Sequence, residues 1–189
     1  MRLWRLVRRA HLADAFTGEG ARRFGGRWNS PGVPVTYTSS SLALAVLETL
    51  VNLEPNRQPS DLVAVSVDLA EGIRHEGIGR ASLPTDWART AAGFLRELGD
   101  AWVSGGRTVA LVVPSAVVEL ETNALLNPAH PDMRRLIIGT AVPFRFASIP
   151  ACSDGVDRQS RAPCQRVVRF AIRYSPRSRG RRTSPSRRN

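Results

Sequence analysis

The alternation of hydrophobic and polar positions predicts strands and helices in turn along the chain. Strand patterns lie at Arg2–Arg8, Val33–Thr38, Leu62–Leu69, Thr108–Val113 and Leu136–Phe146. Helical spacing marks Leu42–Leu53, which follows the capping serines 39–41, and Asp86–Trp102, with an apolar stripe from Trp87 to Trp102. We therefore expect one compact α+β domain of mixed α/β character, with strands at both ends.

Two stretches of this body lack either pattern. His11–Gly32 is polar and rich in glycine, which predicts a long loop of the functional kind, because structureless loops of this length are uncommon. Asn123–Pro131 is expected to form a turn region. Within it, His130 stands between Ala129 and Pro131, where a turn residue that bonds the backbone is the simplest interpretation and a general base is the alternative.

The carboxyl-terminal part differs in composition from the body. Residues 148–189 are dominated by Ser, Pro and Arg, a composition that cannot bury enough apolar surface to fold, so we expect a disordered tail after a domain at 1–147. All 27 basic residues of the 189-residue chain are arginine, and the net charge is +11. Residues 151–189 hold 11 of them against Asp154 and Asp157, so the basic charge belongs to the tail.

Composition also narrows the functional classes. No stretch reaches the length of a membrane span, and Cys152 and Cys164 are too few for a disulfide framework, so a cytoplasmic protein is expected. No Cys or His spacing indicates a metal site. A nucleic-acid-binding protein remains an alternative, but one that rests on nonspecific contacts of the tail alone.

Glu48 is the most informative single residue. It lies in a helix whose other positions are apolar on nearly every side, which predicts that the helix is buried. A buried carboxylate needs a partner, and no basic residue lies three or four positions away. The partner must come from elsewhere in the fold, where a distant arginine is the structural alternative, or from a ligand.

The segment Gly18–Asn29 (GEGARRFGGRWN) is a second candidate for chemistry. Its glycines permit close approach of the backbone to a ligand, and Arg22, Arg23 and Arg27 carry forked donors suited to phosphates. It matches neither a Walker loop nor a dinucleotide-binding fingerprint. Taken alone, a segment rich in glycine and arginine is more often a solvated surface loop.

Four blocks together resemble the RES-domain toxins of bacterial toxin–antitoxin pairs: GEGARRFGGRWN, VTYTSSSLALAVLE, LVVPSAV and NALLNPAHPDM. The resemblance covers roughly residues 3 to 146. The arginine, glutamate and serine that give the family its name correspond to Arg27, Glu48 and Ser115. Tyr37 matches the pocket tyrosine and Arg5 a second pocket arginine, and Asn127 matches a recurrent polar position.

This resemblance implies a fold similar to the ADP-ribosyltransferase toxins and NAD as substrate. Members cleave the nicotinamide–ribose bond by phosphorolysis, with inorganic phosphate as co-substrate, or by hydrolysis; the alternative is transfer of ADP-ribose to a target protein. It also implies an Xre-type antitoxin as partner. The chain would form a hetero-oligomer with this antitoxin or a homodimer. Oligomeric state and acceptor stay open.

The residues suit that chemistry. Cleavage of the nicotinamide–ribose bond passes through an oxocarbenium-like transition state, which a fixed carboxylate such as Glu48 stabilises. Arg27 and Arg5 offer forks for the pyrophosphate and are also candidate partners for Glu48 in the empty enzyme. Tyr37 offers an aromatic face and a hydroxyl donor to nicotinamide or ribose, Ser115 a hydrogen bond to Glu48 or to a ribose hydroxyl, and Asn127 a further binding group.

Overall fold

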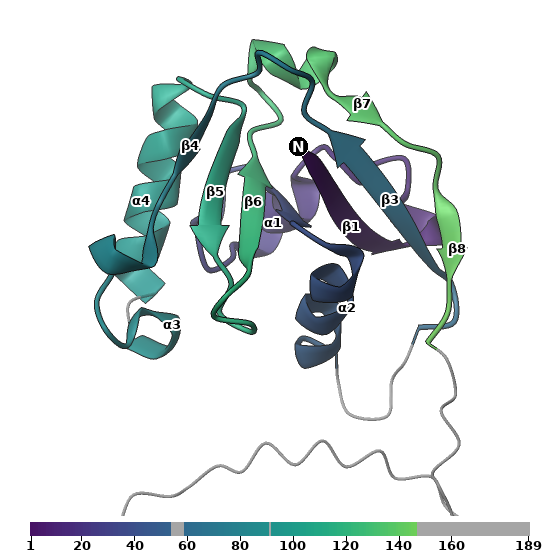
Figure 1. Cartoon of the computed structure of the whole chain (residues 1–189), viewed down its shortest axis with the longest axis horizontal. Helices are drawn as coiled ribbons and strands as arrows, with labels where there is room; N and C mark the ends of the chain where they lie inside the picture. The colour runs from purple at the N-terminus through teal and green to yellow at the C-terminus, as the bar shows by residue number, and fades with distance from the viewer. Residues whose placement is uncertain (54–58, 91, 147–189) are drawn as a thin grey trace, which may run out of the picture. The chain divides into compact units, whose positions relative to one another are not determined.

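A computed structural model describes residues 1–53, 59–90 and 92–146 (Figure 1). The tail predicted at 148–189 lies outside the described residues. The strands are β1 (Arg2–Arg8), β2 (Thr36–Ser39), β3 (Leu62–Asp68), β4 (His75–Gly77), β5 (Ala110–Pro114), β6 (Thr122–Leu126), β7 (Ile137–Ile138) and β8 (Val142–Phe144). The helices are α1 (Glu19–Phe24), α2 (Leu42–Val51), α3 (Trp87–Thr90) and α4 (Ala92–Gly105), with 3₁₀ turns η1 (Arg9–His11), η2 (Arg80–Ser82) and η3 (Pro131–Arg135).

The strands of the described part form one eight-stranded sheet in the order β4-β5-β6-β2-β1-β3-β7, and β8 also pairs with β3. Only β4 and β5 run parallel, and the other neighbours are antiparallel. The sheet curls as it crosses the domain, with α4 beside β4 and β5 and α2 below β1 and β2 (Figure 1). The predicted α+β fold is confirmed.

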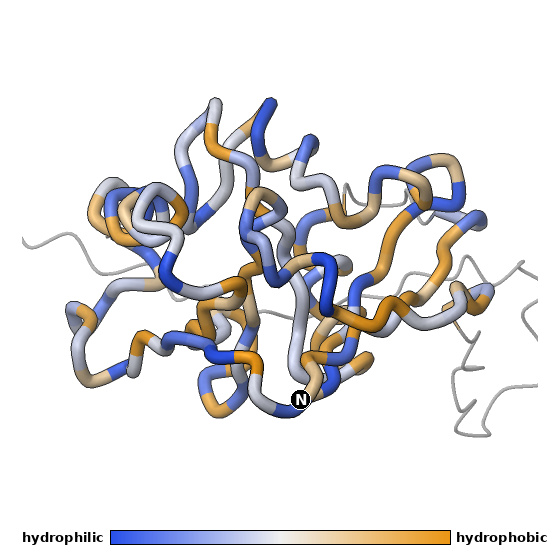
Figure 2. Tube along the Cα trace, turned by 90° about the horizontal axis from the view of Figure 1, so that it is seen from above, coloured by the Kyte–Doolittle hydropathy of each residue, from blue (hydrophilic) through white to orange (hydrophobic). Residues whose placement is uncertain are grey.

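One core cluster joins α4 to the sheet. Leu95 and Trp102 of α4 pack with Leu111 of β5 and Leu125 of β6, all of them buried. Trp28 belongs to the same cluster, and its ring lies 6.0 Å from that of Trp87. A second buried cluster contains Leu3, Val67, Val109, Ala124 and Leu126. Figure 2 shows short hydrophobic stretches alternating with hydrophilic ones along the described chain.

Gly99 sets how closely α4 approaches the rest of the domain. The helix passes the backbone of Trp28 at this residue, and a Cβ placed on Gly99 would collide with the Trp28 carbonyl oxygen. Gly93, earlier in the same helix, faces open space. The glycine at position 99 therefore permits a contact that any side chain would prevent.

β1 and β2 are joined less completely than the other central strands. A single aligned pair, Trp4 with Ser39, connects them, whereas β1 pairs with β3 along its whole length from Arg2 to Arg8. Beyond that pair the strands separate, and Arg5 bridges them with its side chain, whose Nη1 donates to the Tyr37 carbonyl oxygen at 2.8 Å.

Several sequence predictions need correction. The loop expected at His11–Gly32 contains the short helix α1, and the first residues of the turn region expected at Asn123–Pro131 belong to strand β6. The stretch Leu136–Phe146 forms two short strands rather than one. The helix predicted at Asp86–Trp102 is described as α3 and α4. No helix in the described ranges is long and apolar enough to cross a bilayer.

Candidate active site

A cavity of about 360 Å³ lies where β1 and β2 separate above α2. β1 contributes Arg5, β2 contributes Tyr37 and Ser39, α2 contributes Glu48, and β6 contributes Asn123; the remaining lining residues are Trp4, Leu6, Thr38, Ala45, Thr49, Asn52 and Leu53. The volume falls in the range of small-molecule sites. The cavity collects polar residues from β1, from the consecutive elements β2 and α2, and from β6, which lie in three separate parts of the sequence.

α2 presents Glu48 to this cavity. The helix begins at Ser41, whose Oγ accepts the Leu44 amide at 3.1 Å, and it lies against β1 and β2. The predicted burial of this helix is wrong: only Leu44 and Ala45 are buried, Leu47 is 37% exposed and Val51 is 51% exposed. Its continuous apolar surface misled the interpretation, because one side of it faces solvent. Glu48 itself is half-buried.

Two neutral donors converge on one oxygen of Glu48. Ser115 Oγ donates to Oε1 at 2.8 Å, and Asn123 Nδ2 donates to the same atom at 2.6 Å. Among the described residues, Oε2 accepts no hydrogen bond. Arg5 and Arg27, the two arginines considered as partners of Glu48 in the empty protein, are instead bonded to the Tyr37 and Ala88 carbonyl oxygens, so that alternative is wrong for both. The carboxylate is held in place, and within the described ranges no cation forms an ion pair with it.

The hydrogen bonds of the Ser115 hydroxyl fix it as a donor toward Glu48. It is completely buried directly after β5, and its Oγ accepts the backbone N–H groups of Val117 and Val118, both at 3.0 Å. A hydroxyl has two acceptor lone pairs and one proton, so its proton is committed to Glu48. Of the two partners expected for Ser115, Glu48 is the one present. Its hydroxyl positions the carboxylate and has no free lone pair with which to attack a substrate.

Arg5 places a half-buried positive charge beside the same cavity. Its Nη1 is bonded to the Tyr37 carbonyl oxygen, but its Nε is buried without a hydrogen-bond partner. Burial lowers the pKa of this guanidinium to about 10, which still leaves it charged at neutral pH. A half-buried, incompletely bonded cation is costly, and an anionic ligand would relieve that cost.

The Tyr37 hydroxyl turns away from solvent into the glycine-rich segment. It donates to Asn29 Oδ1 at 2.7 Å and accepts the Trp28 amide at 3.0 Å. Burial raises the pKa of this phenol to about 12, so it stays neutral under ordinary conditions. A Cβ on Gly26 would collide with this hydroxyl, which explains a glycine there. The hydroxyl expected to serve a ligand is thus already used within the fold, although Tyr37 remains one of the residues that line the cavity.

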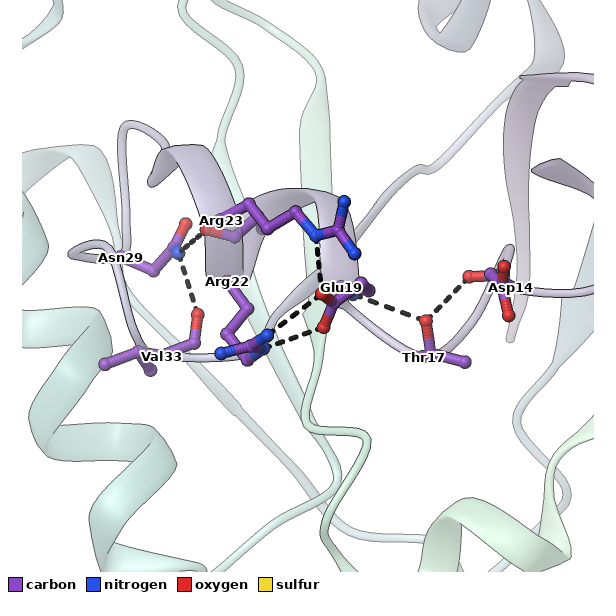
Figure 3. A network of polar contacts seen from close by, with 8 residues as sticks. Asp14, Thr17, Glu19, Arg22, Arg23, Asn29 and Val33 are labelled. Carbon is purple, nitrogen blue, oxygen red and sulfur yellow. Dashed lines mark hydrogen bonds and ion pairs between the residues drawn. The ribbon is translucent and has the colours of Figure 1, made fainter.

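Asn29 ties the glycine-rich segment together. Its Nδ2 donates to the carbonyl oxygens of Ala21 and Val33, each at 2.9 Å (Figure 3). In the same network, Glu19 binds Arg22 at 2.7 Å and Arg23 at 2.6 Å (Figure 3). Those two arginines, considered above for phosphate, are therefore engaged with Glu19 at the surface.

The model of the family described as the RES domain matches residues 2–147. The chain belongs to the RES domain family. It is 36% identical over 138 residues to "Toxin Res" of Photorhabdus laumondii, covering 72% of this chain and 88% of the relative. It is 39% identical over 136 residues to "Prs ADP-ribosylating toxin" of a Sphingobium species, covering 69% and 84%.

A solved structure shares the fold of this RES domain. It is the crystal structure of the Mycobacterium tuberculosis MbcT–MbcA toxin–antitoxin complex, matched with a TM-score of 0.54 and 20% identity over 76% of this chain and 83% of that one. At this identity the likeness concerns the fold alone. The family resemblance stated from the four sequence blocks is confirmed.

The RES domain brings Arg5, Tyr37 and Glu48 to one cavity, with Ser115 behind Glu48. It does not bring Arg27 there. That side chain is exposed, and its Nη1 donates to the Ala88 carbonyl oxygen at 2.6 Å, although its charge is close enough to lower the pKa of Tyr37 slightly against the dominant effect of burial. Among the described residues, its other guanidinium nitrogens have no partner.

Asn127 also lies away from the cavity. It is buried just beyond the end of β6 opposite Asn123, where its Nδ2 donates to the Val103 carbonyl oxygen at 3.2 Å and its Oδ1 accepts the Ala129 amide at 3.0 Å. These bonds explain a buried asparagine as a backbone brace. His130 next to it is a turn residue, as expected: its Nδ1 accepts the Asp132 amide at 3.0 Å and caps η3.

A larger cavity of about 790 Å³ lies between the segment 12–17 and the residues around η3. Its walls are mainly apolar, with His130, Arg134 and Thr17 as polar members. None of Arg5, Tyr37, Glu48 or Ser115 lines it. The smaller cavity is therefore the one that gathers charged groups capable of chemistry.

Sequence reasoning missed Asn123 and Ser39. Asn123 opens the NALLNPAHPDM block, but Asn127 in the same block was singled out in its place. The available signal was an asparagine at the start of an apolar stretch, since asparagine is uncommon in strands. Its contact with Glu48 spans 75 residues and becomes visible only once β6 is aligned with β2.

Proposed function

We propose that this chain is the toxin of a toxin–antitoxin pair and consumes NAD by cleaving the bond between nicotinamide and ribose. The observation that carries the proposal is the pair Arg5 and Glu48, opposite charges that line one cavity without bonding each other. Nε of Arg5 is buried without a hydrogen-bond partner, and Oε2 of Glu48 accepts no hydrogen bond from the described residues. A ligand with an anionic group and a centre that becomes cationic suits both, and relatives named as toxins support the assignment.

In this scheme the C1′–N bond of the nicotinamide riboside unit breaks heterolytically. The electron pair leaves with nicotinamide, which becomes neutral, and the ribose becomes an oxocarbenium ion. Oε2 of Glu48 faces this developing charge, and Ser115 and Asn123 keep the carboxylate from turning. An oxygen of phosphate or water then bonds to C1′ and gives ADP-ribose 1″-phosphate or, with loss of a proton, ADP-ribose.

Phosphate groups of NAD are assigned to the arginines. Arg5 has an unsatisfied donor at the cavity, and Arg27 has free donors on the neighbouring glycine-rich segment. Guanidinium forks bind phosphate oxygens in pairs, which would fix the dinucleotide across the opening. The Tyr37 ring contributes an aromatic wall for the nicotinamide or ribose. Asn127 stays a weaker prediction, since its bonds brace the backbone.

A second activity is favoured by one specific observation. The Sphingobium relative carries the name "Prs ADP-ribosylating toxin", which states that it transfers ADP-ribose to Prs. The same cavity would bind NAD in both cases, and only the nucleophile differs. A basic nucleic-acid-binding role has no support among the described residues, because the excess of arginine belongs to the tail.

Incubation with NAD separates these activities. We expect the purified chain to release nicotinamide with no protein acceptor present, and to form ADP-ribose 1″-phosphate if phosphate is required and ADP-ribose if water suffices. Chromatography of reactions with and without inorganic phosphate provides the measurement. If NAD stays intact until a protein acceptor is added, the transferase activity is correct.

An antitoxin is the partner we propose, in the manner of the structural relative, which was crystallised as a toxin–antitoxin complex. The sequence resemblance predicts a small helix-turn-helix protein of the Xre type, encoded beside this chain. Co-expression with the product of the adjacent gene, followed by co-purification, tests the partnership. Growth arrest by this chain alone and relief on co-expression is the expected result.

Replacing Arg5 by methionine is expected to weaken NAD binding and to leave the chain folded, although the bond to the Tyr37 carbonyl oxygen is lost. The apolar side chain is of similar length and removes a half-buried charge that lacks full hydrogen bonding. We expect the KM for NAD to rise by about tenfold or more, since a hydrogen bond to a charged group is lost. Thermal unfolding and steady-state kinetics measure the two effects.

Arg2→Met is the matched control for this substitution. Arg2 lies in the same strand, but its guanidinium is 61% exposed and paired with Asp68 at 2.8 Å. This variant is expected to keep the KM of the wild type. An equal rise of KM in both variants would show that Arg5 acts through the strand rather than through a ligand.

A further inference from the structure

Asn123 lies between Ser39 and Glu48 in a short chain of hydrogen bonds. Ser39 Oγ donates to Asn123 Oδ1 at 2.8 Å, and Asn123 Nδ2 donates to Glu48 Oε1 at 2.6 Å. Ser39 and Asn123 are aligned partners of β2 and β6, so the sheet itself places them side by side. The bonds connect β2 and β6 to α2 through side chains alone.

The direction of each bond in this chain is fixed. The Ser39 hydroxyl donates to the amide oxygen of Asn123, which leaves the amide nitrogen toward the carboxylate. The reverse orientation would place the amide oxygen against a negative charge. Ser115, whose lone pairs are both occupied, donates to the same Glu48 oxygen from the end of β5, across the turn of the β5–β6 hairpin from Asn123.

The hairpin therefore binds one oxygen of the carboxylate, Oε1, and donates no hydrogen bond to the other, Oε2. Further bonds attach the hairpin to the start of α2: Ser41 Oγ donates to Glu121 Oε2 at 3.1 Å, and the Ser40 amide donates to the Thr122 carbonyl oxygen at 3.1 Å. With Oε1 occupied twice, the rotation of Glu48 about its last side-chain torsion is restrained, and Oε2 has a defined position.

We propose that Asn123, oriented by Ser39, is a positioning residue that holds Glu48 in the geometry needed to stabilise the ribose cation. The inference rests on the proposed function and adds two residues to its machinery. Asparagine is a poor strand former, and a half-buried amide in a strand is costly unless it is bonded. Its presence here at the cavity is explained by the carboxylate it holds.

Kinetics of Asn123→Ala test the proposal. We expect kcat for NAD cleavage to fall by about 10- to 100-fold, the value of a charge-assisted hydrogen bond, while KM stays within about twofold. Ser39→Ala is expected to lower kcat by about 3- to 10-fold, because a bond between neutral groups is lost. Thr122→Ala, next along β6 with an exposed side chain, is the control and is expected to match the wild type. An unchanged kcat, or a rise in KM alone, overturns the proposal.

A measurement without NAD separates this inference from the proposed function. The side-chain amide protons of Asn123 are expected to shift in the NMR spectrum when Glu48→Gln replaces a charged acceptor with a neutral one, whereas those of Asn127, bonded to Val103, serve as the internal reference. No shift at Asn123 overturns the positioning role. A wild-type chain that leaves NAD intact while the shift appears would refute the proposed function and preserve the coupling between Asn123 and Glu48.

Discussion

Glu48→Gln is expected to lower kcat for NAD cleavage by about 100- to 1000-fold, the loss typical of removing one preorganised electrostatic group. The amide retains an oxygen that can accept the bonds from Ser115 and Asn123, so the side chain keeps its place and loses only its charge. A neutral group cannot stabilise the ribose cation. Single-turnover release of nicotinamide measures the chemical step directly.

The matched control for this prediction is Glu97→Gln. Glu97 is an exposed carboxylate on α4, outside the residues that line the cavity, so the variant carries the same change of charge. We expect wild-type turnover from it, and thermal unfolding should show that both variants are folded. Nicotinamide release by Glu48→Gln at the wild-type rate would remove Glu48 from the mechanism.

Gly99→Ala is expected to destabilise the domain by about 3 kcal/mol, the upper part of the range for overpacking. The added methyl group collides with the Trp28 carbonyl oxygen, and a backbone atom cannot rotate aside as a side chain can. In a domain of this size, the melting temperature should fall by about 6–12 °C. Chemical denaturation and calorimetry measure the change.

The sign of this effect separates packing from helix propensity. Alanine is the better helix former by up to about 1 kcal/mol, so propensity alone predicts that Gly99→Ala stabilises the protein. Gly93→Ala in the same helix faces open space and is expected to follow propensity, with a small gain in stability. If the two substitutions changed the free energy of unfolding alike, the close approach of α4 to Trp28 would be contradicted.

The parts of the fold that the sequence predicted are those with a strong local pattern. The alternation in Arg2–Arg8 and the apolar run from Leu62 correspond to β1 and β3, because strand-forming residues there agree with the burial that the sheet imposes. β6 was missed, because TNALL is short and flanked by polar and turn-forming residues. Its strand state comes from pairing with β2 and β5, which is a tertiary effect.

The candidate site was predictable in its residue types and less so in its contacts. Glu48, Arg5 and Tyr37 were recognised, and the structure brings them to one cavity. The pairing of Glu48 with Arg5 or Arg27, considered as an alternative, was wrong. The neutral donors Ser115 and Asn123, on a hairpin about 70 residues away in sequence, bind the carboxylate instead. Spacing along a helix reveals neighbours within that helix, whereas sheet order and register decide which distant side chains meet.

The single aligned pair between β1 and β2 divides the sheet into two panels, β4-β5-β6-β2 and β1-β3 with β7 and β8. Because Arg5 replaces backbone bonds along this seam, the panels are joined at the centre more weakly than at their own internal strands. A ligand bound between β1 and β2 would contact both panels and connect them. Ligand occupancy should therefore slow hydrogen exchange along β1 and β2 more than at the outer edges of the sheet.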